Sequence, residues 1–217
     1  MNSTRFIVVR HGETHWNVAT RIQGQKDSDL TPSGIAQADA IGRRLARERF
    51  DALIASDMGR AMRTAEAIAR HCGLAASPEP RLRERSFGAG EGLTYAEVDA
   101  RWPGVFSRAA NTDPDATIPG GETRRQFHER IRLAFEALAQ AHSGRRVCVV
   151  THGGVLAVLY RIVHDIPLAH AHKVTISNAS YNAVVYDHAA PAEGGSWSLE
   201  AWDDTTHLGE ATPFVES

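Results

Sequence analysis

Two segments of the same kind constrain this chain more than any other feature: apolar runs that each end in histidine and glycine. The first reads FIVVRHG over residues 6–12, and the second reads VCVVTHGG over residues 147–154. Runs of this kind are typical of strands buried on both faces, as in parallel sheets covered by helices. In such sheets ligands bind beyond the carboxyl ends of the strands. We therefore expect His11 and His152 to meet at one edge of a sheet.

The rest of the chain alternates between the two kinds of element. The second run belongs to a strand predicted at residues 145–151, and further strands are predicted at residues 51–56, 179–187 and 196–202. Helices are predicted at residues 30–50, 56–73, 94–102, 122–144 and 152–165. This order predicts an α/β fold, a three-layer sandwich with a mostly parallel central sheet and helices on both faces.

Local signals set the ends of the predicted helices. Thr31 and Pro32 suit a helix start, Gly73 suits a helix end, and Ile35, Ala38, Ile41 and Leu45 form an apolar stripe. Residues 74–92 and 103–121 are rich in glycine and proline and are expected to be irregular. With no repeat and no linker, residues 1–217 are predicted to form one domain, with residues 85–121 as a cap over its site.

Composition narrows the class of protein. Net charge is −2 over 217 residues, which gives no electrostatic footprint for nucleic acid or an anionic membrane surface. The two cysteines, Cys72 and Cys148, lack the spacing of a metal site or disulfide framework. No apolar run approaches the length of a membrane span, and MNSTRFIVV is too short for a signal peptide. A cytoplasmic protein without nucleic-acid or membrane partners is expected.

Arginines join the two histidines at the predicted edge. Arg10 precedes His11, and Arg60 follows the strand at residues 51–56, in the first turn of the next helix. The guanidinium group offers fixed charge and paired donors that match phosphate oxygens. A cation at the positive end of a helix is unfavourable alone, so an anion is expected near Arg60. Each residue alone would suit a structural or surface role, but together they predict a phosphoryl site.

Four blocks along the chain carry a family resemblance: RHGETHWN, SDMGRAMRTA, LRERSFGAGEG and THGG, with RIQGQKDSDLT between the first two. In this order they resemble the phosphoglycerate mutase-like branch of the histidine phosphatase superfamily, over about residues 5–185. The resemblance implies that His11 is the nucleophile that becomes phosphohistidine and that Glu84 protonates the leaving oxygen. It assigns the other site residues to phosphate and substrate binding: Arg10, Asn17, Arg60 and His152 in the phosphate pocket, Thr14 and Gly153 as further phosphate contacts, and Gln23 at the pocket mouth.

Other carboxylates and metal sites are weaker candidates. Glu13, Glu91 and Glu122 are the rivals of Glu84 as proton donor. The histidines of HAH at residues 170–172 lack a full ligand set, and Gly12 interrupts a helical pairing of His11 with His15. No metal and no cofactor are expected.

Three activities fit the resemblance: phosphomonoester hydrolysis, cofactor-dependent phosphoglycerate mutation, and non-enzymatic binding. The resemblance implies an adjacent arginine pair in the cap of mutases, whereas Arg101 and Arg108 are separated and Arg124-Arg125 falls in the following helix. The tail LGEATPFVES is acidic. Hydrolysis of a small phosphorylated metabolite is therefore the first prediction and mutation the alternative. Binding alone is disfavoured because no catalytic residue is missing.

The sequence leaves the substrate and the oligomeric state open. The substrate-selecting side chains are expected among cap residues such as Arg85, Tyr95, Trp102 and Arg108. A homodimer is compatible with the chain and is neither required nor excluded by it.

Overall fold

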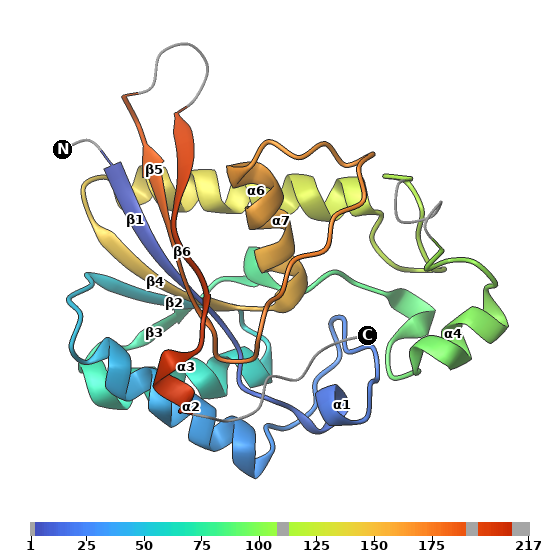
Figure 1. Cartoon of the computed structure of the whole chain (residues 1–217), viewed down its shortest axis with the longest axis horizontal. Coiled ribbons are helices and arrows are strands. Elements are labelled where there is room, and N and C mark those ends of the chain that lie inside the picture. Colours follow the sequence, from blue (N-terminus) through green and yellow to red (C-terminus); the bar gives the residue numbers. More distant parts are fainter. Residues whose placement is uncertain (1–2, 108–112, 190–194, 210–217) are drawn as a thin grey trace.

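The protein is built on one six-stranded sheet. A computed structural model describes residues 3–107, 113–189 and 195–209 (Figure 1). The strands lie in the order β3-β2-β4-β1-β5-β6. Their bounds are Ser3–Arg10 (β1), Ala52–Ala55 (β2), Ala76–Pro78 (β3), Arg146–Thr151 (β4), Tyr181–Asp187 (β5) and Ser196–Asp204 (β6). Strands β3, β2, β4 and β1 run parallel to one another, β5 pairs antiparallel with β1, and β6 pairs antiparallel with β5. The predicted mostly parallel sheet is confirmed.

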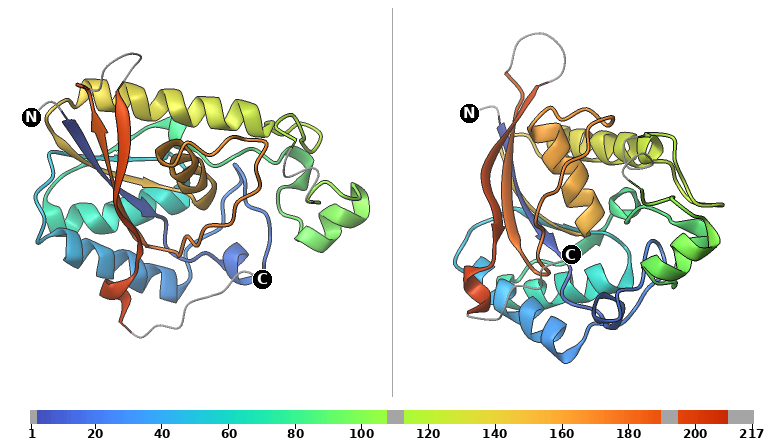
Figure 2. Two further views of the ribbon diagram at one scale, coloured as in Figure 1. Left: turned by 45° about the horizontal axis from the view of Figure 1, so that its top comes forward. Right: turned by 45° about the vertical axis from the view of Figure 1, so that its right-hand side comes forward.

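Helices cover both faces of the sheet and complete the three layers. Helices α2 (Pro32–Leu45) and α3 (Gly59–Cys72) lie on one face, with α6 (Arg124–Ala141) and α7 (Gly153–Val163) on the other (Figures 1 and 2). Alternate residues of β1 serve the two layers, because successive side chains of a strand point to opposite faces. Phe6 and Val8 pack in the core beneath α6 and α7, and Ile7 and Val9 pack in the core beneath α2 and α3.

The predicted signals at the helix ends act as expected, but one residue of the predicted apolar stripe lies outside the core. The Thr31 side chain accepts a hydrogen bond from Gly34 N, and Gly73 ends α3 with φ of 70°. Ile35 is wrong as a core residue, because it is 57% exposed. The first turn of α2 contacts the loop after β1 through Gly34 instead, where a Cβ atom would lie 2.0 Å from Glu13 O. This close backbone approach turns the next side chain outward.

Segments predicted to be irregular contain short elements. The edge strand β3 ends at Pro78, a position where the missing N–H costs no ladder hydrogen bond. The 3₁₀ turns η1 (Pro80–Leu82) and η2 (Gly88–Gly90) follow, and η3 (Thr206–Leu208) comes after β6. The short helix α1 (His15–Val18) lies in the stretch after β1.

The segment after η2 stands apart from the sheet. Its helix α4 (Tyr95–Arg101) lies at the right of Figure 1. A small separate core of Ile22, Val98 and Ile118 holds it. Residues 108–112, with Arg108, and residues 210–217 of the acidic tail lie outside the described residues, so the cap remains a prediction. Within the described ranges, none of the helices combines the length and apolarity needed to cross a membrane.

Candidate active site

The two histidines predicted at one sheet edge lie in contact. Strands β1 and β4 pair in parallel with Arg10 opposite Thr151, so that the next residue of each strand emerges at the same level. The ring centroids of His11 and His152 are 5.3 Å apart. In front of His11 opens a cavity of about 1120 Å³, which Arg10, Arg60 and Glu84 also line. The topology thus brings together the residues that the sequence placed at this edge.

The hydrogen bond of His11 defines its reactive atom. Its Nδ1 lies 2.8 Å from Gly12 O, and since a carbonyl only accepts, Nδ1 carries the proton and Nε2 the lone pair. The side chain is 3% exposed. Burial, followed by the charges of Arg60 and Arg10, holds the pKa of His11 well below its usual value of 6.5. His11 is therefore a neutral imidazole at pH 7, with a nucleophilic nitrogen available.

His152 lies behind His11, fully buried, and is held by Ser56 at the end of β2. Its Nε2 is 2.8 Å from Ser56 Oγ, whereas its buried Nδ1 has no hydrogen-bond partner among the described residues. Burial, then the charges of Arg60, His11 and Arg10, lowers the pKa of His152 well below 6.5. Which ring nitrogen of His152 carries the proton depends on the tautomer, and His152 is not among the described residues that line the cavity. Ser56 carried no predicted role, although it too ends a strand at this edge.

Arg60 is buried in the first turn of α3 and is oriented by the loop after α1. Its guanidinium donates to Gly24 O, Lys26 O and Asp27 Oδ1, each at 2.8 Å. Asp27 Oδ2 also accepts from Gly59 N, 2.6 Å away, at the start of α3. The anion expected beside this cation is therefore Asp27, which the sequence did not single out. Arg60 Nε is buried and has no hydrogen-bond partner in the described parts of the chain, so it can still serve an oxyanion.

The remaining predicted phosphate contacts differ in their placement. Asn17, Gln23 and Gly153 line the cavity, and a Cβ atom on Gly153 would lie 3.4 Å from Arg10 Nε. Thr14 is fully buried and is not among the described residues that line the cavity. Its hydroxyl accepts from Asn17 N and donates to Asn17 Oδ1, forming a capping box for α1. Thr14 therefore orients Asn17, and its contact with phosphate remains a prediction.

Glu84 is the one carboxylate among the described residues that line the cavity. Its Oε2 accepts from Gly154 N at 2.9 Å, and its Oε1 accepts from Arg85 N at 2.8 Å. Residue 154 has to be glycine for this contact, because a Cβ atom there would lie 2.2 Å from Glu84 Oε1. The backbone thus fixes the carboxylate at the start of α7, in the cavity that His11 also lines.

The rival carboxylates have structural partners. Glu13 Oε1 accepts from the Thr31 hydroxyl, and Glu91 Oε1 accepts from Gln25 N and Phe87 N. Glu122 accepts both donors of a bidentate pair with Arg130. Over the described ranges, no group of three or more His, Cys, Asp or Glu side chains is arranged to hold a metal ion.

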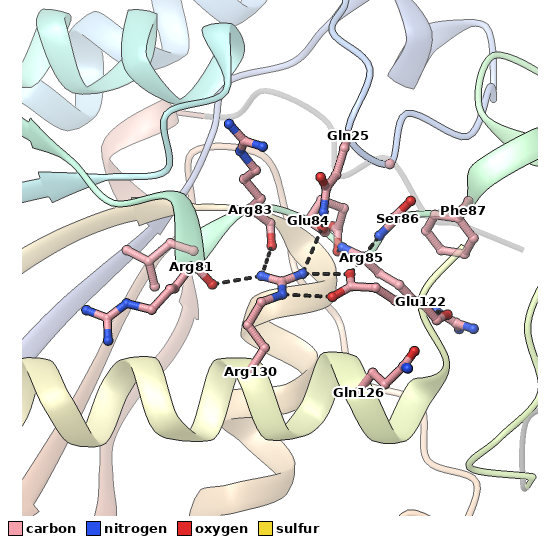
Figure 3. A network of polar contacts seen from close by, with 12 residues as sticks. Gln25, Arg81, Arg83, Glu84, Arg85, Ser86, Phe87, Glu122, Gln126 and Arg130 are labelled. Atoms are coloured by element: carbon pink, nitrogen blue, oxygen red, sulfur yellow. Dashed lines mark hydrogen bonds and ion pairs between the residues drawn. The ribbon is translucent and has the colours of Figure 1, made fainter. Parts of the chain in front are cut away.

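Arg130 of α6 organises the segment that carries Glu84 (Figure 3). Its guanidinium donates to Arg81 O at 2.7 Å, Arg83 O at 2.9 Å and Glu84 O at 3.2 Å. Its ion pair with Glu122 closes the network, because Glu122 Oε2 also accepts from Ser86 N. This network was not predicted, because Arg130 and the three carbonyls it holds are 46, 47 and 49 positions apart in the chain.

The cavity is strongly basic. Seven arginine or lysine side chains line it: Arg10, Arg21, Arg60, Arg85, Arg124, Arg161 and Lys173. Arg124, which the sequence places in the helix after the cap, lines the cavity because α6 begins at the cavity wall. Arg125 instead pairs with Asp115 on the surface. Of the predicted selecting residues, Arg85 and Tyr95 line the cavity, whereas Trp102 packs in the small core beside α4.

Comparison with known proteins identifies the family. The model of the histidine phosphatase superfamily (branch 1) matches residues 6–205. The chain belongs to this superfamily. A metal-independent phosphoserine phosphatase of Arabidopsis thaliana is 40% identical over 208 residues, covering 94% of this chain and 83% of the relative. A probable phosphoglycerate mutase of Photorhabdus laumondii is 36% identical, covering 93% of each chain.

Solved structures of this superfamily share the fold. A mycobacterial glucosyl-3-phosphoglycerate phosphatase in complex with VO3 superposes with a TM-score of 0.81 at 32% identity, over 93% of this chain and 99% of that one. A phosphoglycerate mutase from Bacillus anthracis gives a TM-score of 0.80 at 25% identity, over 95% and 96% of the two chains. The resemblance carried by the four sequence blocks is confirmed.

Proposed function

We propose that this histidine phosphatase hydrolyses phosphomonoesters of small metabolites through a phosphohistidine on His11. The observation that carries the proposal is the neutral, buried His11, which lines a cavity together with Arg10 and Arg60 and whose Nδ1 is engaged by Gly12 O. Phosphoryl transfer requires in-line positioning and neutralised equatorial oxygens more than it requires covalent assistance. The arginines supply the charge, and His152, in contact with His11, is the proposed further phosphate ligand.

In the first step, His11 Nε2 attacks phosphorus while the bond from phosphorus to the ester oxygen breaks. Positive charge that develops on the imidazole is shared with Gly12 O through the Nδ1–H hydrogen bond. The leaving alkoxide needs a proton, and Glu84 in its acid form provides it. The Gly154 and Arg85 N–H groups aim the carboxyl group toward the leaving oxygen.

In the second step, water attacks the phosphohistidine. Glu84, now a carboxylate, takes a proton from this water as its oxygen bonds to phosphorus. The bond from phosphorus to Nε2 breaks, inorganic phosphate leaves, and both His11 and Glu84 return to their starting protonation states. The two half-reactions therefore balance with one carboxyl group and one imidazole.

Mutation is the alternative because relatives carry both names, phosphatase and probable phosphoglycerate mutase. The test supplies 3-phosphoglycerate with and without 2,3-bisphosphoglycerate, and measures inorganic phosphate and the 2-phospho isomer together. We expect phosphate release to exceed isomerisation. Isomerisation outrunning phosphate release tenfold, about 1.4 kcal/mol in barrier, would assign the mutase activity instead.

The intermediate is tested by rapid quench of a reaction with a ³²P-labelled phosphomonoester. Wild-type protein should carry an acid-labile, base-stable label, and His11→Ala should carry none. Label on a serine or an aspartate would contradict the mechanism. Glu84→Gln should slow the hydrolysis of alkyl phosphates far more than that of p-nitrophenyl phosphate, whose leaving group needs no proton.

A further inference from the structure

The segment just before β5, residues 176–179, holds the end of β1 where the proposed nucleophile lies. Asn178 Nδ2 donates a hydrogen bond to His11 O at 2.9 Å, and it also donates to Asn17 Oδ1 at 3.4 Å. One side-chain amide therefore joins the backbone of the nucleophile to a predicted phosphate ligand. Asn178 carried no predicted role, and the steps proposed for the reaction do not use it.

The backbone partners of the two amides determine how each amide is turned. A carbonyl only accepts hydrogen bonds, so the atom of Asn178 that faces His11 O is the nitrogen. Asn17 Oδ1 lies 3.1 Å from Thr14 N and 3.0 Å from the Thr14 hydroxyl. Because a backbone N–H only donates, the atom of Asn17 that faces Thr14 N is the oxygen. With Asn178 as a third donor to Oδ1, the Nδ2 of Asn17 is the end of the amide that remains for a ligand.

The segment that carries Asn178 is itself fixed to the strands on either side. Arg10 Nη1 donates to Ile176 O at 2.5 Å, and Ala179 N donates to Arg10 O at 3.0 Å. On the other side, Ser177 N donates to Asp203 Oδ1 of β6 at 2.6 Å. The position of the Asn178 amide relative to β1 is therefore determined by the backbone around it.

The backbone adopts an unfavourable conformation where the segment meets the nucleophile. Ala179, which is fully buried, has φ of 52°, and Asp203 has φ of 47°. Residues other than glycine rarely adopt such values, and they persist at functional sites where the surrounding contacts hold them. In this conformation Ala179 N lies 3.3 Å from His11 O, the same carbonyl that Asn178 contacts.

We propose that Asn178 is a positioning residue of the phosphoryl site, which ties the Asn17 amide to the backbone of His11 so that Asn17 Nδ2 donates to the phosphoryl group. The inference rests on the proposed phosphatase function and adds a residue to its site. Asn17 lines the cavity, whereas Asn178 is not among the described residues that do. Asn178 therefore acts through Asn17, and it keeps the phosphate ligand in register with the nucleophile, as in-line transfer requires.

Two substitutions separate hydrogen bonding by Asn178 from space filling. Asn178→Ala removes the amide, and Asn178→Leu replaces it by an uncharged group of similar size and branching. We expect both variants to raise the inhibition constant of inorganic phosphate, with p-nitrophenyl phosphate as substrate, by about tenfold, the size of a lost hydrogen bond to a charged ligand. Restoration of the wild-type constant in Asn178→Leu would overturn the proposal.

Ser177→Ala is the matched control. It changes the neighbouring residue of the same segment and removes the hydroxyl, which lies 3.2 Å from Asp203 Oδ2, while the bond from Ser177 N to Asp203 is kept. This variant should leave the inhibition constant of phosphate unchanged. A rise as large as that in Asn178→Ala would mean that the segment supports the fold without a particular role for Asn178.

A double-mutant cycle tests whether Asn178 acts through Asn17. In the Asn17→Ala background, Asn178→Ala should raise the inhibition constant of phosphate much less than it does in the wild type, because the amide that it positions is already missing. Equal factors in the two backgrounds would refute the proposed link.

A binding measurement distinguishes failure of this proposal from failure of the proposed function. If no phosphomonoester is hydrolysed, p-nitrophenyl phosphate included, the phosphatase function fails. The rise in melting temperature that inorganic phosphate produces by mass action still tests Asn178. A shift in the wild type and Ser177→Ala that Asn178→Ala and Asn178→Leu reduce supports the proposal. No shift in the wild type, or equal shifts in all four proteins, would refute it.

Discussion

Replacing Arg130 by methionine should both destabilise the protein and weaken proton donation by Glu84. The change removes donors to three backbone carbonyls and both donors to Glu122. The side chains of Arg130 and Glu122 are only 22% and 21% exposed, so in the variant the Glu122 carboxylate is left without its cationic partner in a half-buried position. Breaking a buried ion pair costs about 3–5 kcal/mol, and the residual exposure puts the expected loss of unfolding free energy at the lower end, about 3 kcal/mol.

Urea unfolding measures the loss, and Arg132→Met is its control. Arg132 is two residues away on α6 and pairs with Glu129 and Glu136 at the surface, where such pairs are worth about 0–1 kcal/mol. The double variant Arg130→Met/Glu122→Gln should recover part of the stability, because it removes the stranded charge. A cost in Arg130→Met no larger than that of Arg132→Met would refute the argument.

Activity gives a readout that general destabilisation does not. Arg130 holds the carbonyl of Glu84 itself, so its loss should misplace the proton donor. Hydrolysis of an alkyl phosphate should therefore fall more than hydrolysis of p-nitrophenyl phosphate, well below the unfolding temperature of the variant. Equal losses on both substrates would mean that Arg130 supports the fold and has no share in placing Glu84.

Three further results are expected. His11→Ala should lose all phosphate release and keep a cooperative unfolding transition, checked by turnover and circular dichroism. His11 and His152 stay neutral in the folded protein, whereas both histidines become protonated in the unfolded chain below about pH 6.5. The free energy of unfolding should therefore fall as the pH is lowered from 6.5 to 5, by at most about 1.4 kcal/mol per pH unit for each histidine. This pH dependence should be weaker in His11→Ala. Asp27→Ala removes the acceptor of Gly59 N at the start of α3 and a hydrogen-bond partner of Arg60. It should lower the free energy of unfolding in urea by about 1–2 kcal/mol and raise the inhibition constant of vanadate. Unaltered inhibition would contradict a role of Asp27 in orienting Arg60.

Sequence reasoning found what local pattern and topology determine. The strands at β1 and β4 are apolar runs, and parallel pairing then places His11 and His152 together without any knowledge of side chains. It missed contacts that depend on how distant segments pack. Asp27 reaches Arg60 across 33 positions and Ser56 reaches His152 across 96, and neither separation leaves a periodic trace in the chain.

Helix α6 contributes both to the cavity wall and to the segment that carries Glu84. It begins at the cavity wall, which Arg124 lines. Six positions later, Arg130 holds the Glu84 segment, and between them Phe127 is 5% exposed, with the Arg130 guanidinium 5.1 Å from its ring centre. The helix is fixed to the sheet by buried Ile131 and other apolar side chains. The cavity wall at Arg124 and the placement of the proton donor thus depend on one helix, so a core substitution that shifts α6 should change substrate preference and leaving-group dependence together.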